Sequence, residues 1–251
     1  MSASPFAERL AVELQPILRS IRRVLAPPPP FDPATSRREF RVAFPDLTMS
    51  LFPLLVSRVR REAPSVLMEW IARDAHALPA LSEERIDIGL YPSAMALPEG
   101  LDRQEVGTLQ WATFARRDHP AAAAWGRKAW LRWPHVAVRV GVQLQNPVER
   151  AAGRLARRRR IVAWVPHFSS VAQMLSQSDL LATLPAVVMH DALERFGLRA
   201  LPVPFPIEPM PHRLVWSQRL GSDPGLRWLR AHAEQVLRTA LKASGVTTGA
   251  R

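Results

Sequence analysis

Residues 41–91 have the sequence RVAFPDLTMSLFPLLVSRVRREAPSVLMEWIARDAHALPALSEERIDIGLY, in which two hydrophobic periods alternate. Short apolar or alternating runs predict strands, and apolar spacings of three and four residues predict helices. We expect strands at 41–44, 66–72 and 86–91, and helices at 49–62 and 77–85. Strand–helix–strand units form parallel sheets whose faces are covered by helices. This stretch therefore predicts an α/β fold.

The same alternation continues through the rest of the chain. Further strands are expected at 109–116, 136–140, 161–165, 181–184, 198–203 and 212–219, with a turn of helix at 130–133 and helices at 147–157, 171–178, 187–196 and 224–242. Two mostly parallel sheets fit this length better than one. If the last strand and helix rejoin the first sheet, the chain crosses between two lobes near 109–113 and 205–209. We therefore expect subdomain I at 37–110 and 208–243, subdomain II at 111–207, and a cleft between them.

A separate helix is expected before the first sheet. Apolar residues between Phe6 and Leu25 form one stripe at spacings of three, four and seven. Pro27 to Pro30 then prevent the helix from continuing, because each ring fixes φ and removes an amide donor. Residues 1–30 are predicted to be a helix followed by a stiff proline-rich hinge. The stripe must be buried against another element or against a second chain.

Composition excludes several classes of protein. The 251 residues are 47% hydrophobic and 22% charged, as in soluble globular proteins, and contain no cysteine. Disulfides, thiolate metal sites and thiol nucleophiles are therefore excluded. No apolar run is long enough to span a membrane, and the first residues do not form a signal core, so we expect a cytoplasmic protein without a membrane partner.

The net charge of +12 is concentrated in one region. Residues 111–160 contain twelve basic side chains against two acidic ones, Asp118 and Glu149. Such a field attracts anions, which could be nucleic acid, an acidic metabolite or an acidic protein face. The alternative is that Arg157 to Arg160 form a solvated turn. Charge alone does not choose between these interpretations.

Seven short motifs occur in a fixed order along the chain. They are PLL at 53–55, IDIGL at 86–90, RDHP at 117–120, FSS at 168–170, SDLLATLP at 178–185, WSQR at 216–219 and DPGLRWLR at 223–230. Together, over residues 37–243, they resemble the effector-binding region of LysR-type transcriptional regulators. The last two resemble the subgroup that responds to aromatic or flavonoid-like signals.

The resemblance implies a two-lobed fold like that of type 2 periplasmic binding proteins. Its two Rossmann-like subdomains would be joined by two crossover strands and preceded by a linker helix, here Phe6 to Leu25. The family's N-terminal winged helix-turn-helix domain is expected to be absent from this chain. DNA would then be bound only through that absent domain.

Candidate effector contacts come from the principle that ligands of open α/β sheets bind beyond the carboxyl ends of strands. Thr48 is the first choice, because the family usually has a hydroxyl residue there that touches the effector. The alternatives are that Asp46, Thr48 and Ser169 cap helices and that Tyr91 and Phe168 pack in the core. The full set is Asp46, Thr48, Met49, Arg73, Tyr91, Ser93, Phe168, Ser169 and Pro185.

Two arginines beside predicted strands suggest an anionic effector. Arg139 or Arg160 would select a carboxylate through its planar pair of donors if it faced the cleft, although either could lie on the surface. No common hydrolase, nucleotide-binding or metalloprotease motif occurs, and the seven histidines lack metal-ligand spacing. Asp118 and His119 precede Pro120 and are interpreted as a turn rather than part of a catalytic triad. We expect no catalytic residue, no metal and no cofactor besides an unidentified effector.

The sequence is therefore interpreted as the effector-sensing and oligomerisation region of a LysR-type regulator. A homodimer or homotetramer is expected. As the resemblance implies, the 49–62 helix would pack against the 147–157 helix of a second chain. One alternative is a free-standing solute-binding protein that serves a transporter, and another is an enzyme on the same fold.

Overall fold

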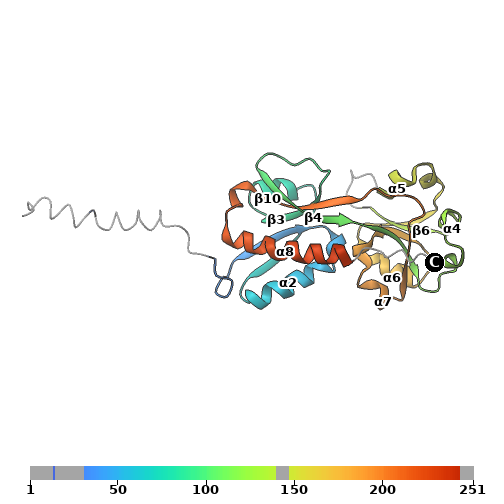
Figure 1. Cartoon of the computed structure of the whole chain (residues 1–251), viewed down its shortest axis with the longest axis horizontal. Helices are drawn as coiled ribbons and strands as arrows, with labels where there is room; N and C mark the ends of the chain where they lie inside the picture. Colours follow the sequence, from blue (N-terminus) through green and yellow to red (C-terminus); the bar gives the residue numbers. More distant parts are fainter. Residues whose placement is uncertain (1–13, 15–30, 140–146, 244–251) are drawn as a thin grey trace, which may run out of the picture. The chain divides into compact units, whose positions relative to one another are not determined.

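The computed structural model describes residues 31–139 and 147–243, together with Leu14 (Figure 1). Contacts divide the chain into Met1–Asp32 and Pro33–Arg251, and all the sheets belong to the second unit. The expected linker helix and the proline-rich hinge at 27–30 lie outside the described residues, apart from Leu14.

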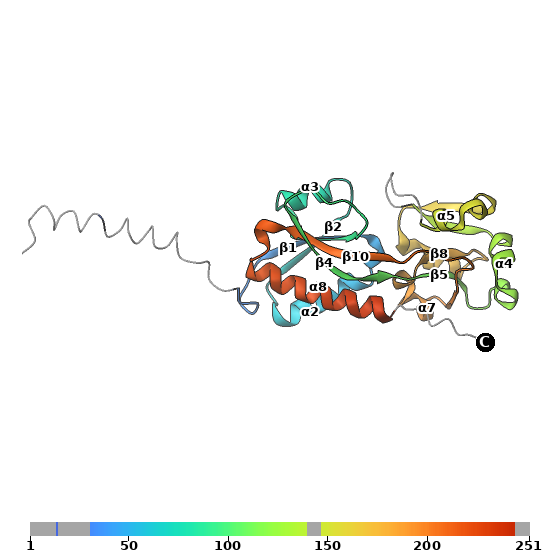
Figure 2. The ribbon, with the colours of Figure 1, turned by 45° about the horizontal axis from the view of Figure 1, so that its top comes forward.

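The first sheet has five strands in the order β2-β1-β3-β10-β4. β1 is parallel to β2 and β3, whereas β10 is antiparallel to β3 and β4. Figure 2 shows α3 on one face of this sheet and α2 with α8 on the other. We call these elements lobe I: β1 (Glu39–Phe44), α2 (Leu51–Glu62), β2 (Leu67–Ala72), α3 (Ala77–Ser82), β3 (Ile88–Pro92), β4 (Leu101–Leu109), β10 (Met210–Ser217) and α8 (Pro224–Ala243).

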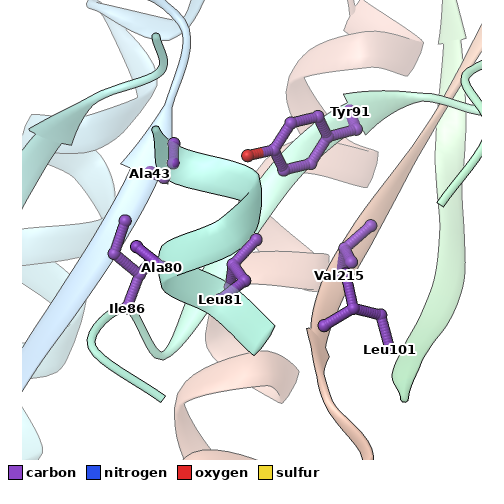
Figure 3. Packing of buried hydrophobic residues seen from close by; sticks show 8 residues of the cluster. Ala43, Ala80, Leu81, Ile86, Tyr91, Leu101 and Val215 are labelled. Atoms are coloured by element: carbon purple, nitrogen blue, oxygen red, sulfur yellow. The ribbon is translucent and has the colours of Figure 1, made fainter. Parts of the chain in front are cut away.

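Small residues let α3 lie close to the lobe I sheet. Ala43, Ala80 and Leu81 are buried together with Tyr91 in one hydrophobic cluster (Figure 3). A Cβ atom at Gly89 would lie 2.5 Å from Cε2 of Tyr91 and 3.0 Å from Cδ1 of Leu81. Close packing therefore requires the glycine of the IDIGL motif.

The remaining strands form two smaller sheets. One has the order β8-β5-β9 and the other pairs β6 with β7, and a bridge between His135 and Leu181 joins them. The chain leaves lobe I at Gln110 and returns between Leu201 and Met210. We call these elements lobe II: β5 (Trp111–Arg116), α4 (Arg127–Arg132), β6 (His135–Val138), α5 (Pro147–Ala152), β7 (Ile161–Val165), α6 (Val171–Ser176), β8 (Ala182–Pro185), α7 (Ala192–Arg195) and β9 (Leu198–Leu201).

Short 3-10 helices occupy many of the connections. Three of them, η1, η4 and η5, follow the ends of β1, β7 and β8, and η1 contacts the other two. Their bounds, with those of the others, are η1 (Asp46–Thr48), η2 (Pro120–Ala124), η3 (Gly153–Arg158), η4 (Phe168–Ser170), η5 (Ala186–Met189) and η6 (Gln218–Leu220).

Several expected elements were wrong in detail. The polar run 102–105 hid β4, so the predicted 109–116 strand is in fact the end of β4 and all of β5. The predicted 147–157 helix stops at Ala152, because Gly153 has φ +53° and η3 follows. The 187–196 helix is divided between η5 and α7. The mostly parallel arrangement fails in lobe II, where β8 and β9 both run antiparallel to β5.

Within the ranges 31–139 and 147–243, no helix is long and apolar enough to cross a bilayer.

Candidate functional site

One edge of the lobe I sheet collects four strand ends. β1, β2 and β3 are parallel, so their carboxyl ends lie at the same edge. β4 also ends there, because β3 and β4 are both antiparallel to β10. Since β4 continues through Gln110 into lobe II, this edge is the one from which the chain crosses between lobes.

Five polar or aromatic residues near this edge form what we call the strand-end cluster: Arg73, Tyr91, Ser93, Glu105 and His212. The Arg73 Cζ atom lies 5.3 Å from the centroid of the Tyr91 ring. Ser93 Oγ donates to Glu105 Oε2 at 2.6 Å. His212 pairs with Pro92 of β3 and Gly107 of β4. The cluster thus draws its side chains from β4, from β10, from β3 with the residue that follows Pro92, and from the residue that follows β2.

Burial leaves hydrogen-bonding capacity in this cluster unused. Among the described residues, neither Arg73 Nε nor Tyr91 Oη has a hydrogen-bond partner. Desolvation lowers the pKa of Arg73, and it raises the pKa of Tyr91 to about 12, opposed by the positive charge of Arg73. Arginine nonetheless remains charged near neutral pH. The site therefore offers a partly desolvated cation and a neutral phenol, groups that suit a carboxylate or hydroxyl ligand.

His212 contributes a neutral ring to the same cluster. Burial, together with the nearby Arg73 charge, lowers its pKa to about 4, whereas the Met210 hydrogen bond and Glu105 act in the opposite direction. Its Nδ1 atom lies 3.0 Å from the Met210 carbonyl oxygen, which fits Nδ1–H as the donor. His212 therefore adds no second positive charge near neutral pH.

The first predicted site residue, Asp46, contacts lobe II directly. Its Oδ2 atom accepts hydrogen bonds from the backbone N–H groups of Phe168, at 2.5 Å, and Ser169, at 3.3 Å. The 3-10 helix that contains Asp46, η1, also contacts η5 of lobe II. We call this set of contacts the interlobe junction. The structure thus brings together Asp46, Phe168 and Ser169, predicted from positions far apart in the sequence.

Other predicted site residues surround the junction. Thr48 is 1% exposed, and its Oγ1 donates to the Pro45 carbonyl oxygen at 2.7 Å, so its hydroxyl stabilises the turn that contains it. Met49 is 36% exposed. Pro185 is buried at the end of β8, immediately before η5. Tyr91 has its ring inside the lobe I core, as the packing alternative proposed (Figure 3).

Both predicted arginines lie on the surface, which was the alternative to a place in the cleft. Arg139 is exposed and lies over the Trp164 ring at 4.1 Å, and Arg160 is exposed. The buried one is their neighbour Arg159, whose guanidinium lies 3.8 Å from Glu149 and over the Trp130 ring.

Sequence reasoning also missed Glu105 and His212, because β4 was not recognised. Recognising the antiparallel pairing of β4 with β10 would have placed both beside Ser93.

The residues of the RDHP motif form a turn. His119 is buried and its Nδ1 accepts from the Ala121 N–H at 3.0 Å, which caps η2. Asp118 instead forms an ion pair with Arg116, which lowers the pKa of the Asp118 carboxyl. The two side chains therefore do not form a catalytic pair.

Over the described part of the chain, no three His, Asp or Glu side chains gather as metal ligands. A shallow hollow of about 250 Å³ lies along α8, lined by residues from Ala231 to Lys242. It belongs to that helix and not to the interlobe junction.

One protein family and several transcriptional regulators match most of this chain. The family described as LysR substrate binding domain matches residues 33–238. The HTH-type transcriptional activator NahR of Pseudomonas putida is 28% identical over 235 residues, which cover 92% of this chain and 77% of that protein. LinR, an HTH-type transcriptional regulator of Sphingobium indicum, is 28% identical over 94% of this chain and 79% of its own.

Solved structures give the same picture. A probable transcriptional regulator from Pseudomonas aeruginosa is 26% identical, with a TM-score of 0.72 over 94% of this chain and 78% of that chain. The regulatory domain of MexT, a transcriptional activator in the same organism, is 25% identical, with a TM-score of 0.70 over 81% of this chain and 100% of that chain. By their names, all four of these proteins are regulators of transcription.

Proposed function

This chain belongs to the family of LysR substrate-binding domains, and from that premise we propose that it senses a small anionic or aromatic effector between its two lobes. The predicted family and two-lobed α/β fold are confirmed. The chain is the effector-binding region of a transcriptional regulator, and the relatives do not support the solute-binding alternative. It would act in the cytoplasm without a metal or cofactor other than the effector, and DNA would be bound only through a winged helix-turn-helix domain.

The effector would contact the strand-end cluster on lobe I and the segments η4 and η5 on lobe II. A ligand bound to both lobes favours one relative placement of them, because it binds that placement more tightly. Such coupling is typically about 1–3 kcal/mol. The arrangement of the oligomer, and through it transcription, would then respond to the effector.

The proposal depends on the position and the desolvation of the Arg73 guanidinium. It follows the end of β2 at the edge where the chain crosses to lobe II, its Nε lacks a partner within the described residues, and desolvation lowers its pKa. A desolvated guanidinium without a carboxylate gains most from an incoming anion. The sensing proposal therefore assigns the effector's acidic group to Arg73.

Benzoate and its neutral analogue benzamide provide a matched pair of probes. Replacing Arg73 by Met should weaken benzoate binding about 10–100-fold, the value of one charge-assisted hydrogen bond, and change benzamide binding little. Isothermal titration calorimetry measures both. Arg85→Met is the control, because Arg85 is exposed and paired with Glu83 outside the cluster. Equal losses for both ligands would remove Arg73 from the anion site, and failure of wild type to bind any aromatic carboxylate would refute an anionic aromatic effector.

We further propose that two copies of the chain associate through edge strands. β2 ends the five-stranded sheet and exposes Leu67, which is 56% accessible, and α2 exposes Leu54, which is 54% accessible. In lobe II, β7 pairs only with β6 among the described strands and exposes Val162 and Trp164. Edge strands with exposed apolar side chains are surfaces that invite pairing. A two-fold arrangement would bring α2 and β2 of one copy onto α5 and β7 of the other.

Charged substitutions on these strands should separate the copies. Leu67→Lys and Trp164→Lys are each expected to raise the dimer dissociation constant at least about tenfold, because each buries a charge in an apolar contact. Sedimentation equilibrium on the full chain measures this constant. Met95→Lys is the control, since Met95 is exposed to a similar degree but lies in the loop after β3. Unchanged self-association in both test variants would exclude this interface.

A further inference from the structure

The interlobe junction contains an unusual combination of groups. Asp46 belongs to lobe I, and the two N–H groups that its Oδ2 accepts belong to Phe168 and Ser169 at the start of η4 in lobe II. One carboxylate oxygen therefore bridges the lobes with two hydrogen bonds, one of them at 2.5 Å. Hydrogen bonds to a charged carboxylate are stronger than neutral ones.

Apolar contacts support this bridge on the same 3-10 helix. Leu47 and Thr48, the other residues of η1, are buried, and so are all four residues of η5, which η1 contacts. Asp46 itself is only half-buried. The carboxylate thus lies at the rim of a contact that already excludes water, where water can replace it when the lobes separate.

We propose that Asp46 is a latch that holds lobes I and II together in the ligand-free chain. Its carboxylate fixes η1 of lobe I to η4 of lobe II, and opening the lobes exchanges these hydrogen bonds for water. The inference rests on the proposed function only for its consequence: the effector binds the lobe placement in which the latch is released, and only a fraction of the ligand-free chains have that placement. The apparent affinity is then the intrinsic affinity multiplied by the fraction of chains with the latch released.

A simple helix-capping role makes a different prediction. A cap would stabilise η4 and leave the lobe placement unchanged when removed. A latch would change the distance between lobes. Asp74 provides the matched control, because its Oδ1 accepts from the His76 N–H at 2.8 Å and both residues lie within lobe I.

The test measures the interlobe distance directly. The chain has no native cysteine, so spin labels attach only at introduced ones. Ala94→Cys after β3 of lobe I and Gln173→Cys on α6 of lobe II place one label at an exposed position of each lobe. Pulsed electron paramagnetic resonance on the full chain, diluted with unlabelled protein to suppress distances between copies, gives the distance distribution.

Asp46→Ala should shift this distribution to longer distances and broaden it, and Asp46→Asn should do so to a smaller degree. Asp74→Asn should leave the distribution unchanged. Circular dichroism establishes that each variant is folded, and Asp46→Asn, which keeps the side-chain volume, decides the question if the alanine variant unfolds. An unchanged distribution in a folded Asp46 variant, or an equal shift in Asp74→Asn, would overturn the latch.

Ligand binding then separates the latch from the sensing proposal. Releasing the latch should tighten benzoate and benzamide binding by the same factor, about fivefold or more, because both ligands use the opened population. Tightening of benzoate alone would instead indicate simple removal of a repelling charge and would count against the latch. A distance shift without binding of either ligand would retain the latch and reject these ligands as effectors.

Discussion

Lowering the pH from 7 to 5 should destabilise the chain by about 4 kcal/mol through two buried histidines alone. Burial lowers the pKa of His135 from 6.5 to about 3 and that of His212 from 6.5 to about 4. The unfolded chain binds protons below pH 6.5, whereas the folded chain resists them until its lower pKa values are reached. Stability is therefore complete above about pH 6.5 and is lost progressively as the pH falls toward 3–4.

The surroundings of His135 explain this resistance to protonation. The residue is 0% exposed, and its Nε2 lies 2.7 Å from the Trp130 carbonyl oxygen, which fits Nε2–H as the donor. Its Nδ1 has no hydrogen-bond partner among the described residues, and the nearby Arg159 charge contributes to the lowered pKa of His135. A proton on Nδ1 would thus create a second buried cation without an acceptor.

Urea unfolding at pH 7 and pH 5 tests this assignment. His135→Asn keeps an N–H donor and does not titrate, so it should reduce the difference in unfolding free energy between the two pH values by about 2 kcal/mol. The exposed His190 provides the control, and His190→Asn should leave the difference as in wild type. A pH dependence in His135→Asn equal to that of wild type would show that other groups cause the acid sensitivity.

Sequence alone predicted lobe I more accurately than lobe II. β1 to β3 and their helices follow regular hydrophobic periods and pair with neighbours in the chain, so local pattern determines them. β4 was missed because Asp102, Arg103, Gln104 and Glu105 are polar and the apolar residues are sparse. In lobe II, β5 pairs with β8 and β9, and local periodicity carries no information on such distant, antiparallel partners.

The candidate site shows the same limit. The positions of Asp46 and Phe168 after strand ends singled out two residues that the structure places in contact, since loops after parallel strands meet at one edge. The hydrogen bond between the Asp46 carboxylate and the Phe168 N–H could not be predicted from the residue types, because every residue except proline has a backbone N–H. Arg159 and Arg160 are likewise adjacent and identical, yet only the first is buried. Orientation at a turn decides this, and the sequence pattern does not encode it.

Replacing Trp130 by Ala should cost about 3–5 kcal/mol of folding stability, as is typical for a fully buried tryptophan. Trp130 is 0% exposed and packs edge-to-face against His135 and Phe205, with ring centroids 4.8 and 4.9 Å away. Its Nε1 donates to Thr183 Oγ1 at 3.1 Å, and Thr183 bonds in turn to Thr113. Truncation removes this packing and leaves a cavity in the centre of lobe II.

The loss should be concentrated in lobe II, because Trp130 and Tyr91 belong to separate hydrophobic clusters. Amide hydrogen exchange in Trp130→Ala should therefore accelerate in β5, β8 and β9 before it does so in β1 and β3. Trp130→Phe is the matched variant: it keeps an aromatic ring, loses the donor to Thr183, and should cost only about 1–2 kcal/mol. Equal acceleration in both lobes would show that they unfold as one unit. A sensor that changes the relative placement of its lobes requires each lobe to have its own stable core, because each core must stay intact while the lobes move.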